Sequence, residues 1–177
     1  MKVLIVIDMQ NDFLDGALRN EEGIKIIPNV CEKIKEYKAN GDVVIATRDT
    51  HSDEYLNTQE GKRLPIEHCI KDSEGWEINS DVNEALGNSL KFDKPSFGSI
   101  DLANYLKEEY EGEDNLEIEL VGVCTDICVI SNAIVIKASL PEARVIVDAA
   151  CTAGISKEGH QNALNAMKVC QIDVIGE

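Results

Sequence analysis

The hydrophobic pattern of the chain predicts strands that alternate with helices. Residues 2–7 form an apolar, β-branched run without polar alternation, which is typical of a parallel strand buried on both faces. Further short apolar runs occur at 43–46, 90–92, 116–123, 144–147 and 174–175. Consecutive parallel strands need crossover helices, and such units are right-handed. The pattern therefore predicts an α/β fold, a doubly wound and roughly six-stranded parallel sheet with helices on both faces.

Helical spacing of apolar residues fills the intervals between these runs. Residues 28–38 are expected to form a helix that has Pro28 near its start and stops at Asn40-Gly41. Further helices are predicted to begin near Ser99, Asp126 and Ser156.

The segment 49–89 breaks this alternation, because it shows weak periodicity and only small apolar islands. Long connections in compact domains are usually functional or disordered. This one contains His51, His68 and Trp76, so we expect it to form a metal-binding and substrate loop. The length of 177 residues otherwise suits one domain that spans residues 1–177.

Composition narrows the class of protein. The formal net charge of −16 disfavours phosphate backbones and anionic membranes as partners. No apolar run approaches the roughly 18 residues that cross a bilayer, and the short apolar start that ends at Asp8 does not resemble a secretory signal. We therefore expect a cytoplasmic protein that binds neither nucleic acid nor membrane. The six cysteines are expected to be free thiols, metal ligands or a catalytic group.

Polar and reactive side chains follow four of the predicted strands. Asp8 ends the first strand, Asp49 and His51 follow the second, Lys94 follows the third, and Cys128 lies shortly after the fourth. In doubly wound sheets, ligands bind beyond the carboxyl ends of the strands, near the point where strand order reverses. We therefore expect these groups to meet at one edge of the sheet.

Cys128 is the predicted nucleophile. It falls in the first turn of a predicted helix, where unpaired N–H groups and the helix dipole favour a thiolate. Asp8 could accept the thiol proton, and Lys94 could stabilise both anions, which is an activated-nucleophile arrangement. Taken singly, Cys128 is as well explained as a small buried cysteine, Asp8 as a turn residue and Lys94 as a surface lysine.

A second group of residues suits a divalent metal. Asp49 and His51 form a D-x-H pair whose side chains share a direction on an extended backbone, and Glu60 and His68 follow. Two imidazoles and two carboxylates suit Zn²⁺, Fe²⁺ or Mn²⁺. The alternative is a polar surface loop. The third histidine, His160, is expected at the surface or at a helix cap.

Three motifs match a known family: residues 5–13 (IVIDMQNDF), 94–98 (KPSFG) and 122–129 (GVCTDICV). On these motifs, and along nearly the whole chain, the sequence resembles the isochorismatase-like cysteine hydrolases, and within them the nicotinamidases. The resemblance implies the three-layer α/β/α fold of that family. It also implies a catalytic triad of Asp8, Lys94 and Cys128.

The resemblance further implies the surroundings of the nucleophile. A non-proline cis peptide bond is implied between Val123 and Cys124. The N–H groups of Cys124 and Cys128 would then form an oxyanion hole. Three apolar side chains are expected to line the substrate ring: Phe13, Phe97 and Ile127.

The metal residues favour nicotinamidase within the family. Related hydrolases of isochorismate, carbamoyl or ureido compounds generally lack a D-x-H pair followed by a later histidine, as found here at residues 49–51 and His68. Many nicotinamidases have another histidine soon after D-x-H, and Glu60 is expected to replace it here. Zn²⁺ is the expected ion, with Fe²⁺ and Mn²⁺ as alternatives.

The resulting hypothesis is an enzyme that hydrolyses nicotinamide to nicotinate and ammonia through a thioester on Cys128. One alternative is another family hydrolase that acts on a carbamoyl or ureido substrate. A second is a non-catalytic redox or binding module in which Cys124 and Cys128 are oxidised, and a third is a purely structural domain. The resemblance also allows a homo-oligomer, since these are common in the family.

Overall fold

The computed structural model describes residues 1–177 and contains one six-stranded sheet in which all neighbouring strands are parallel. The strand order is β3-β2-β1-β4-β5-β6, as in the doubly wound fold. The strands are β1 (Lys2–Ile7), β2 (Val43–Asp49), β3 (Leu90–Lys94), β4 (Glu117–Val123), β5 (Arg144–Ala153) and β6 (Asp173–Ile175). The predicted fold class is therefore confirmed.

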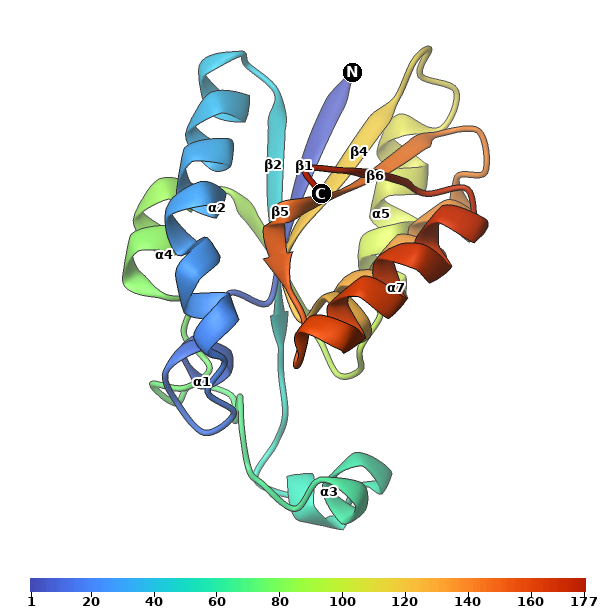
Figure 1. The fold of residues 1–177 in the computed structure, drawn as a ribbon. Coiled ribbons are helices and arrows are strands. Elements are labelled where there is room, and N and C mark those ends of the chain that lie inside the picture. The colour runs from blue at the N-terminus through green and yellow to red at the C-terminus, as the bar shows by residue number, and fades with distance from the viewer.

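Helices cover both faces of the sheet, so the molecule has three layers (Figure 1). Helices α2 and α4 pack on one face and α5, α6 and α7 on the other, while α3 lies apart, beyond the carboxyl ends of the strands. The helices are α1 (Asn11–Leu14), α2 (Glu21–Ala39), α3 (Gln59–Arg63), α4 (Ser80–Leu86), α5 (Ile100–Tyr110), α6 (Ile130–Ser139) and α7 (Lys157–Val169), with short turns η1 (Tyr55–Asn57) and η2 (Thr125–Val129).

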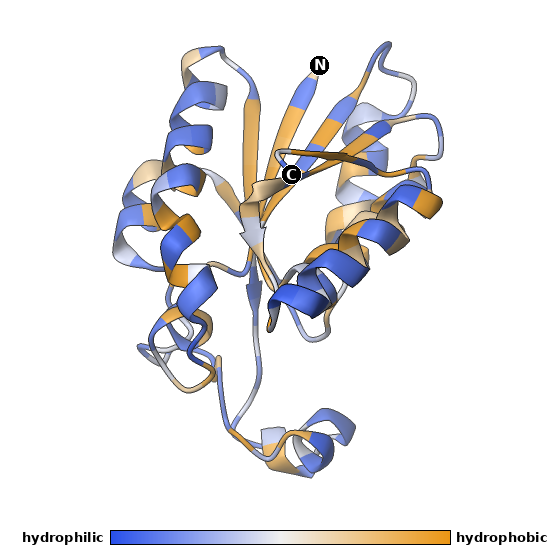
Figure 2. Ribbon diagram, in the orientation of Figure 1, coloured by the Kyte–Doolittle hydropathy of each residue, from blue (hydrophilic) through white to orange (hydrophobic).

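The apolar strands form two cores, one on each face of the sheet. In β1, Ile5 and Ile7 contribute to the core under α5, α6 and α7, whereas Leu4 and Val6 contribute to the core under α2 and α4. All four side chains are buried. Figure 2 shows the same division, with apolar strands and with a hydrophilic carboxyl end on β2. In β1 the only polar residue is Lys2 at its start, and Asp8 follows its carboxyl end.

Helix α2 begins earlier than the sequence pattern predicts. It starts at Glu21, after Asn20, whose side chain accepts hydrogen bonds from the N–H groups of Glu22 and Gly23. Pro28 therefore lies inside the helix rather than at its start. Proline has no N–H group, so one hydrogen bond of the helix is lost at this position. The Asn20 cap and burial of the apolar helix face offset this loss.

The segment 49–89 contains more regular structure than its weak periodicity indicates. Strand β2 continues to Asp49, which pairs with Lys94 in the β2–β3 register, and η1, α3 and α4 follow. Helix α4 adds Val82 and Leu86 to the core under α2. These elements are short, so their apolar residues are too few to give a clear helical period.

Gly122 allows β4 to approach β1 at the point where strand order reverses. Its φ is +111°, and a Cβ atom there would lie 2.1 Å from the carbonyl oxygen of Ile7. Only glycine fits this position. The close approach brings the end of β1, at Asp8, next to the end of β4, at Cys124.

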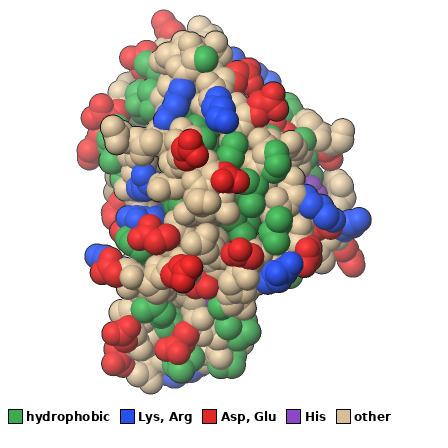
Figure 3. All heavy atoms as spheres, turned by 90° about the vertical axis from the view of Figure 1, so that its left-hand side faces the viewer, with side chains coloured by type: hydrophobic (Ala, Val, Ile, Leu, Met, Phe, Trp, Pro, Cys, Tyr) green, Lys and Arg blue, Asp and Glu red, His purple; other side chains and the backbone are tan.

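Charges of both signs are mixed on the face shown in Figure 3. On the face that carries α2 and α4, acidic side chains are mixed with Lys and Arg, and apolar side chains lie between them (Figure 3). None of the helices combines the length and apolar character that a membrane span requires.

A buried ionic cluster joins α2 to the centre of the sheet. Lys33 Nζ lies 2.9 Å from Glu119 Oε1 and 2.8 Å from Asp148 Oδ2. The Tyr37 hydroxyl donates a 2.6 Å hydrogen bond to the other oxygen of Glu119. One lysine is therefore the shared ion-pair partner of two carboxylates that the strands bury.

We predict that Lys33→Met lowers the free energy of unfolding by about 3–5 kcal/mol, because Glu119 and Asp148 stay buried without a counter-ion. Urea unfolding followed by circular dichroism measures this loss. Lys35→Met is the control, since Lys35 is exposed on the same helix, and it should change stability by no more than about 0.5 kcal/mol. A loss for Lys33→Met below about 1 kcal/mol, the scale of a surface ion pair, would contradict the prediction.

Candidate active site

Three side chains meet where strand order reverses. Lys94 Nζ lies 2.6 Å from Asp8 Oδ2 and 3.6 Å from Cys128 Sγ. Asp8 and Lys94 are completely buried, and Cys128 is 5% exposed. The structure therefore brings together the three residues that were predicted from separate strand ends.

The main-chain conformation of Asp8 and a hydrogen bond from Thr47 hold its carboxylate in place. Asp8 has a φ of +47°, in the left-handed region that non-glycine residues seldom adopt, and such residues are frequent at functional sites. The Thr47 hydroxyl donates a 2.6 Å hydrogen bond to Asp8 Oδ1. Thr47 was not among the site residues predicted from the sequence. It lies two residues before Asp49 on an extended strand, so the two side chains point to the same face of the sheet.

The thiol of Cys128 differs from the sequence-based expectation. Burial raises its pKa well above the ordinary value, and the charge of Asp8 and a hydrogen bond with Asp8 raise it further, while Lys94 lowers it. This shift runs opposite to the expected tendency toward a thiolate, because burial and the charge of Asp8 act against the local dipole. The thiol needs a proton acceptor, and Asp8 is next to it.

The nucleophile turn, residues 124–129, begins with a cis peptide bond between Val123 and Cys124. This confirms the implied geometry. Cys128 lies in η2, a π-type turn, rather than in the first turn of the α-helix that follows. The Cys124 carbonyl accepts hydrogen bonds from the N–H groups of Ile127 and Val129, which closes the turn into a compact unit.

A metal-binding group lies beside this site. Asp49, His51, Glu60 and His68 each offer one donor atom, and the four atoms lie within 4.8 Å of one another. His51 Nε2 is 2.8 Å from Asp49 Oδ2, and each histidine Nε2 is 3.8 Å from Glu60 Oε1. Burial opposes ionisation of Asp49, but hydrogen bonds from the two histidines hold its pKa well below the ordinary value.

The donors of this group fit a divalent ion. Two imidazole nitrogens and two carboxylate oxygens form a ligand set used for zinc and similar metals. Asp49 Oδ1 is buried and has no hydrogen-bond partner, although Lys94 Nζ lies 3.6 Å away. The four predicted residues are thus brought together, Glu60 among them.

Side chains around the metal-binding group fix its position, and the sequence did not identify their roles. The Gln10 side chain bonds to both the N–H and the carbonyl of Asp49, and to the carbonyl of Trp76. Asp12 accepts a 2.7 Å hydrogen bond from the N–H of Cys69, next to His68. Gln10 and Asp12 belong to the 5–13 motif, and their membership of this motif is the sequence feature that could have indicated their roles.

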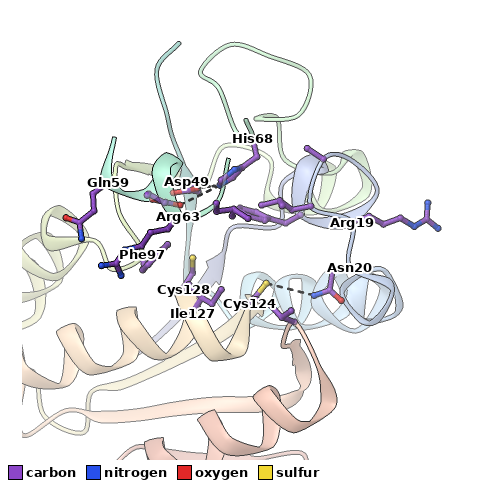
Figure 4. Close-up of a pocket in the computed structure, with 16 residues that line it drawn as sticks. Arg19, Asn20, Asp49, Gln59, Arg63, His68, Phe97, Cys124, Ile127 and Cys128 are labelled. Atoms are coloured by element: carbon purple, nitrogen blue, oxygen red, sulfur yellow. Dashed lines mark hydrogen bonds and ion pairs between the residues drawn. The ribbon is translucent and has the colours of Figure 1, made fainter. Parts of the chain in front are cut away.

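Cys128 of the triad and three residues of the metal-binding group, Asp49, Glu60 and His68, line one cavity of about 860 Å³. Cys124, Cys128, Asp49 and His68 line it, so both sets of polar groups face the same space. Figure 4 shows the Cys128 sulfur below Asp49 and His68. The three apolar residues predicted beside the substrate also line the cavity: Phe13, Phe97 and Ile127.

Comparison with known proteins places this fold and site in a family. The isochorismatase domain model matches residues 2–176. The isochorismatase family protein PncA of Bacillus subtilis is 34% identical over 93% of this chain and 92% of its own length. The nicotinamidase/pyrazinamidase of Mycobacterium tuberculosis is 26% identical over 99% of this chain and 98% of its own.

Solved structures agree with the sequence comparison. The pyrazinamidase of Pyrococcus horikoshii in complex with zinc is 28% identical and superposes with a TM-score of 0.83, covering 99% of both chains. This chain belongs to the isochorismatase family.

Proposed function

We propose that this protein is a metal-dependent nicotinamidase, a cysteine hydrolase that converts nicotinamide to nicotinate and ammonia. The observation that carries the proposal is one cavity lined both by Cys128, which contacts the buried Asp8–Lys94 pair, and by Asp49, Glu60 and His68 of the metal-binding group. Relatives along the full length of the chain are nicotinamidases, which confirms the predicted class of hydrolases acting on linear amides.

The metal-binding group is the reason to propose a pyridine carboxamide as the substrate. Asp49, His51, Glu60 and His68 would hold the ion, and a relative of known structure contains zinc. The bound ion supplies a Lewis-acid position for the pyridine nitrogen. Phe13 stands 5.6 Å from the His68 ring, centroid to centroid, and forms an apolar wall for the substrate ring.

Proton transfer to Asp8 would generate the nucleophile. The Cys128 thiol gives its proton to Asp8, and the thiolate attacks the carboxamide carbon. The N–H groups of Cys124 and Cys128 stabilise the oxyanion, with about 2.7–4 kcal/mol for each donor. Asp8 then returns the proton to the departing nitrogen, so ammonia leaves and a thioester remains.

Asp8 serves again in the second half of the reaction. It takes a proton from water, which attacks the thioester carbon, and the tetrahedral adduct expels the Cys128 sulfur with that proton. Burial raises the pKa of Asp8, and the charge of Lys94 limits this rise. A carboxylate with a raised pKa is a better base than an ordinary aspartate, and the charge of Lys94 favours its ionised form.

Ammonia release from four amides tests the proposal. We expect release from nicotinamide and pyrazinamide, and none from carbamoylsarcosine or ureidoacrylate, because only the first two offer a ring nitrogen to the metal position. Release confined to the last two compounds would assign the site to another family reaction. Release from none would overturn the proposal.

Replacement of the nucleophile should abolish turnover. We predict that Cys128→Ala lowers kcat by on the order of 10⁴-fold or more, as removal of a covalent nucleophile does elsewhere, while circular dichroism stays unchanged. Cys170→Ser is the matched control, since Cys170 is an exposed thiol outside the site. Nearly normal turnover by Cys128→Ala would exclude the thioester route.

Glu60 should contribute to metal affinity. We predict that Glu60→Ala weakens zinc binding by at least about tenfold, since loss of even a residue that only supports the ligands costs about that much, as measured by zinc titration against a chromophoric chelator. Glu67→Ala is the control, because Glu67 is exposed and lies outside the donor group. Equal zinc affinity in Glu60→Ala and the parent protein would remove Glu60 from the ligand set.

A further inference from the structure

The nucleophile turn is attached to helix α7 by a side chain that the reaction itself does not use. Nδ1 of His160 lies 2.8 Å from Oγ1 of Thr125, the first residue of η2. His160 is half-buried in the first turns of α7, so its expected place at the surface or at a helix cap is wrong. The α7 cap is Ser156, which accepts a hydrogen bond from Gly159.

Thr125 depends on this contact. Its side chain is completely buried, and His160 is the only partner of its hydroxyl group. A buried hydroxyl without a partner is unfavourable, so the contact fixes the rotamer of Thr125. Thr125 directly follows Cys124 and lies three residues before Cys128, so its position sets where the turn begins.

A second contact attaches the same turn to the segment before α7. Asp126 Oδ1 accepts a 3.1 Å hydrogen bond from the N–H of Ile155. Gly159 makes room for this carboxylate, because a Cβ atom there would lie 2.3 Å from Asp126 Oδ2. Asp126 bonds to main chain, whereas Thr125 relies on one side chain. The His160 contact is therefore the one that a substitution can remove cleanly.

We propose that His160 is a positioning residue, which holds the nucleophile turn through Thr125 and thereby places the Cys128 sulfur and the Cys124 N–H for attack. His160 does not line the cavity that contains Cys128. It therefore acts through the nucleophile turn rather than by direct contact with substrate or metal, and its main effect is expected on the chemical step. The role of His160 depends on the proposed function only in the experiments that measure turnover.

His160→Leu tests this role, because leucine keeps apolar bulk but cannot bond to Thr125. We expect kcat for nicotinamide to fall by about 10–100-fold, the range for a nucleophile displaced by a distant change, with KM and zinc affinity within about twofold. His160→Asn should recover most of the activity, because its amide places an oxygen or nitrogen near the position of Nδ1. Asn162→Ala, exposed on the same helix, should match the parent.

A double-mutant cycle separates this contact from general loosening. Thr125→Val should lower kcat as much as His160→Leu does, and the double variant should lose no more than either single one. Additive losses, an equally impaired His160→Asn, or a His160→Leu kcat within twofold of the parent would each overturn the proposal.

Hydrogen exchange tests the proposal without any substrate. In His160→Leu, and equally in Thr125→Val, the amides of residues 124–130 should exchange about tenfold faster, because the turn opens locally more often. Unchanged exchange there would overturn the positioning role. If the parent protein failed to hydrolyse nicotinamide, the proposed function would fall while this measurement still decided the role of His160.

Discussion

The fully buried ion pair between Asp8 and Lys94 is the interaction on which the rest of the site depends. Two charges removed from water are stable only when each remains paired, and loss of one partner leaves the other uncompensated. Lys94 meets this condition for more than one group, since its Nζ lies 2.6 Å from Asp8 and 3.6 Å from both Asp49 and Cys128. One ammonium therefore links the nucleophile to the metal-binding group.

The sheet makes this burial feasible because each charged group sits at the end of an otherwise apolar strand. Asp8 ends β1, and Asp49 and Lys94 are register partners at the ends of β2 and β3. The ends of β1 and β4 approach closely because Gly122 lets the two main chains meet. The apolar core surrounds these strand ends, so the charged groups rely on one another and on a few polar neighbours, such as the Thr47 hydroxyl that donates to Asp8.

Much of this could be predicted from the sequence, for identifiable reasons. Apolar runs such as residues 2–7 give the parallel strands directly, and the rule for strand ends then places Asp8, Lys94 and Cys128 at one edge. The supporting contacts could not be predicted in this way. The bonds from Thr47 to Asp8 and from His160 to Thr125 join residues 39 and 35 positions apart. No local pattern encodes such pairs, because the first depends on how β1 and β2 pair and the second on how α7 docks against η2.

The raised pKa of the Cys128 thiol shows why its position near the start of a helix was not enough to predict its acidity. A dipole at the start of a turn stabilises an anion weakly, whereas burial opposes it strongly, and the negative charge of Asp8 adds to that opposition. The raised pKa favours the protonated thiol, and in the proposed reaction Asp8 is the group that takes this proton. Because Lys94 favours the charged forms of both Asp8 and Cys128, it lowers the cost of having an anion on either side of that transfer. In the proposed reaction the thiol must reach Asp8 for proton transfer and the carboxamide carbon for attack, so the placement of the sulfur matters as well as its acidity.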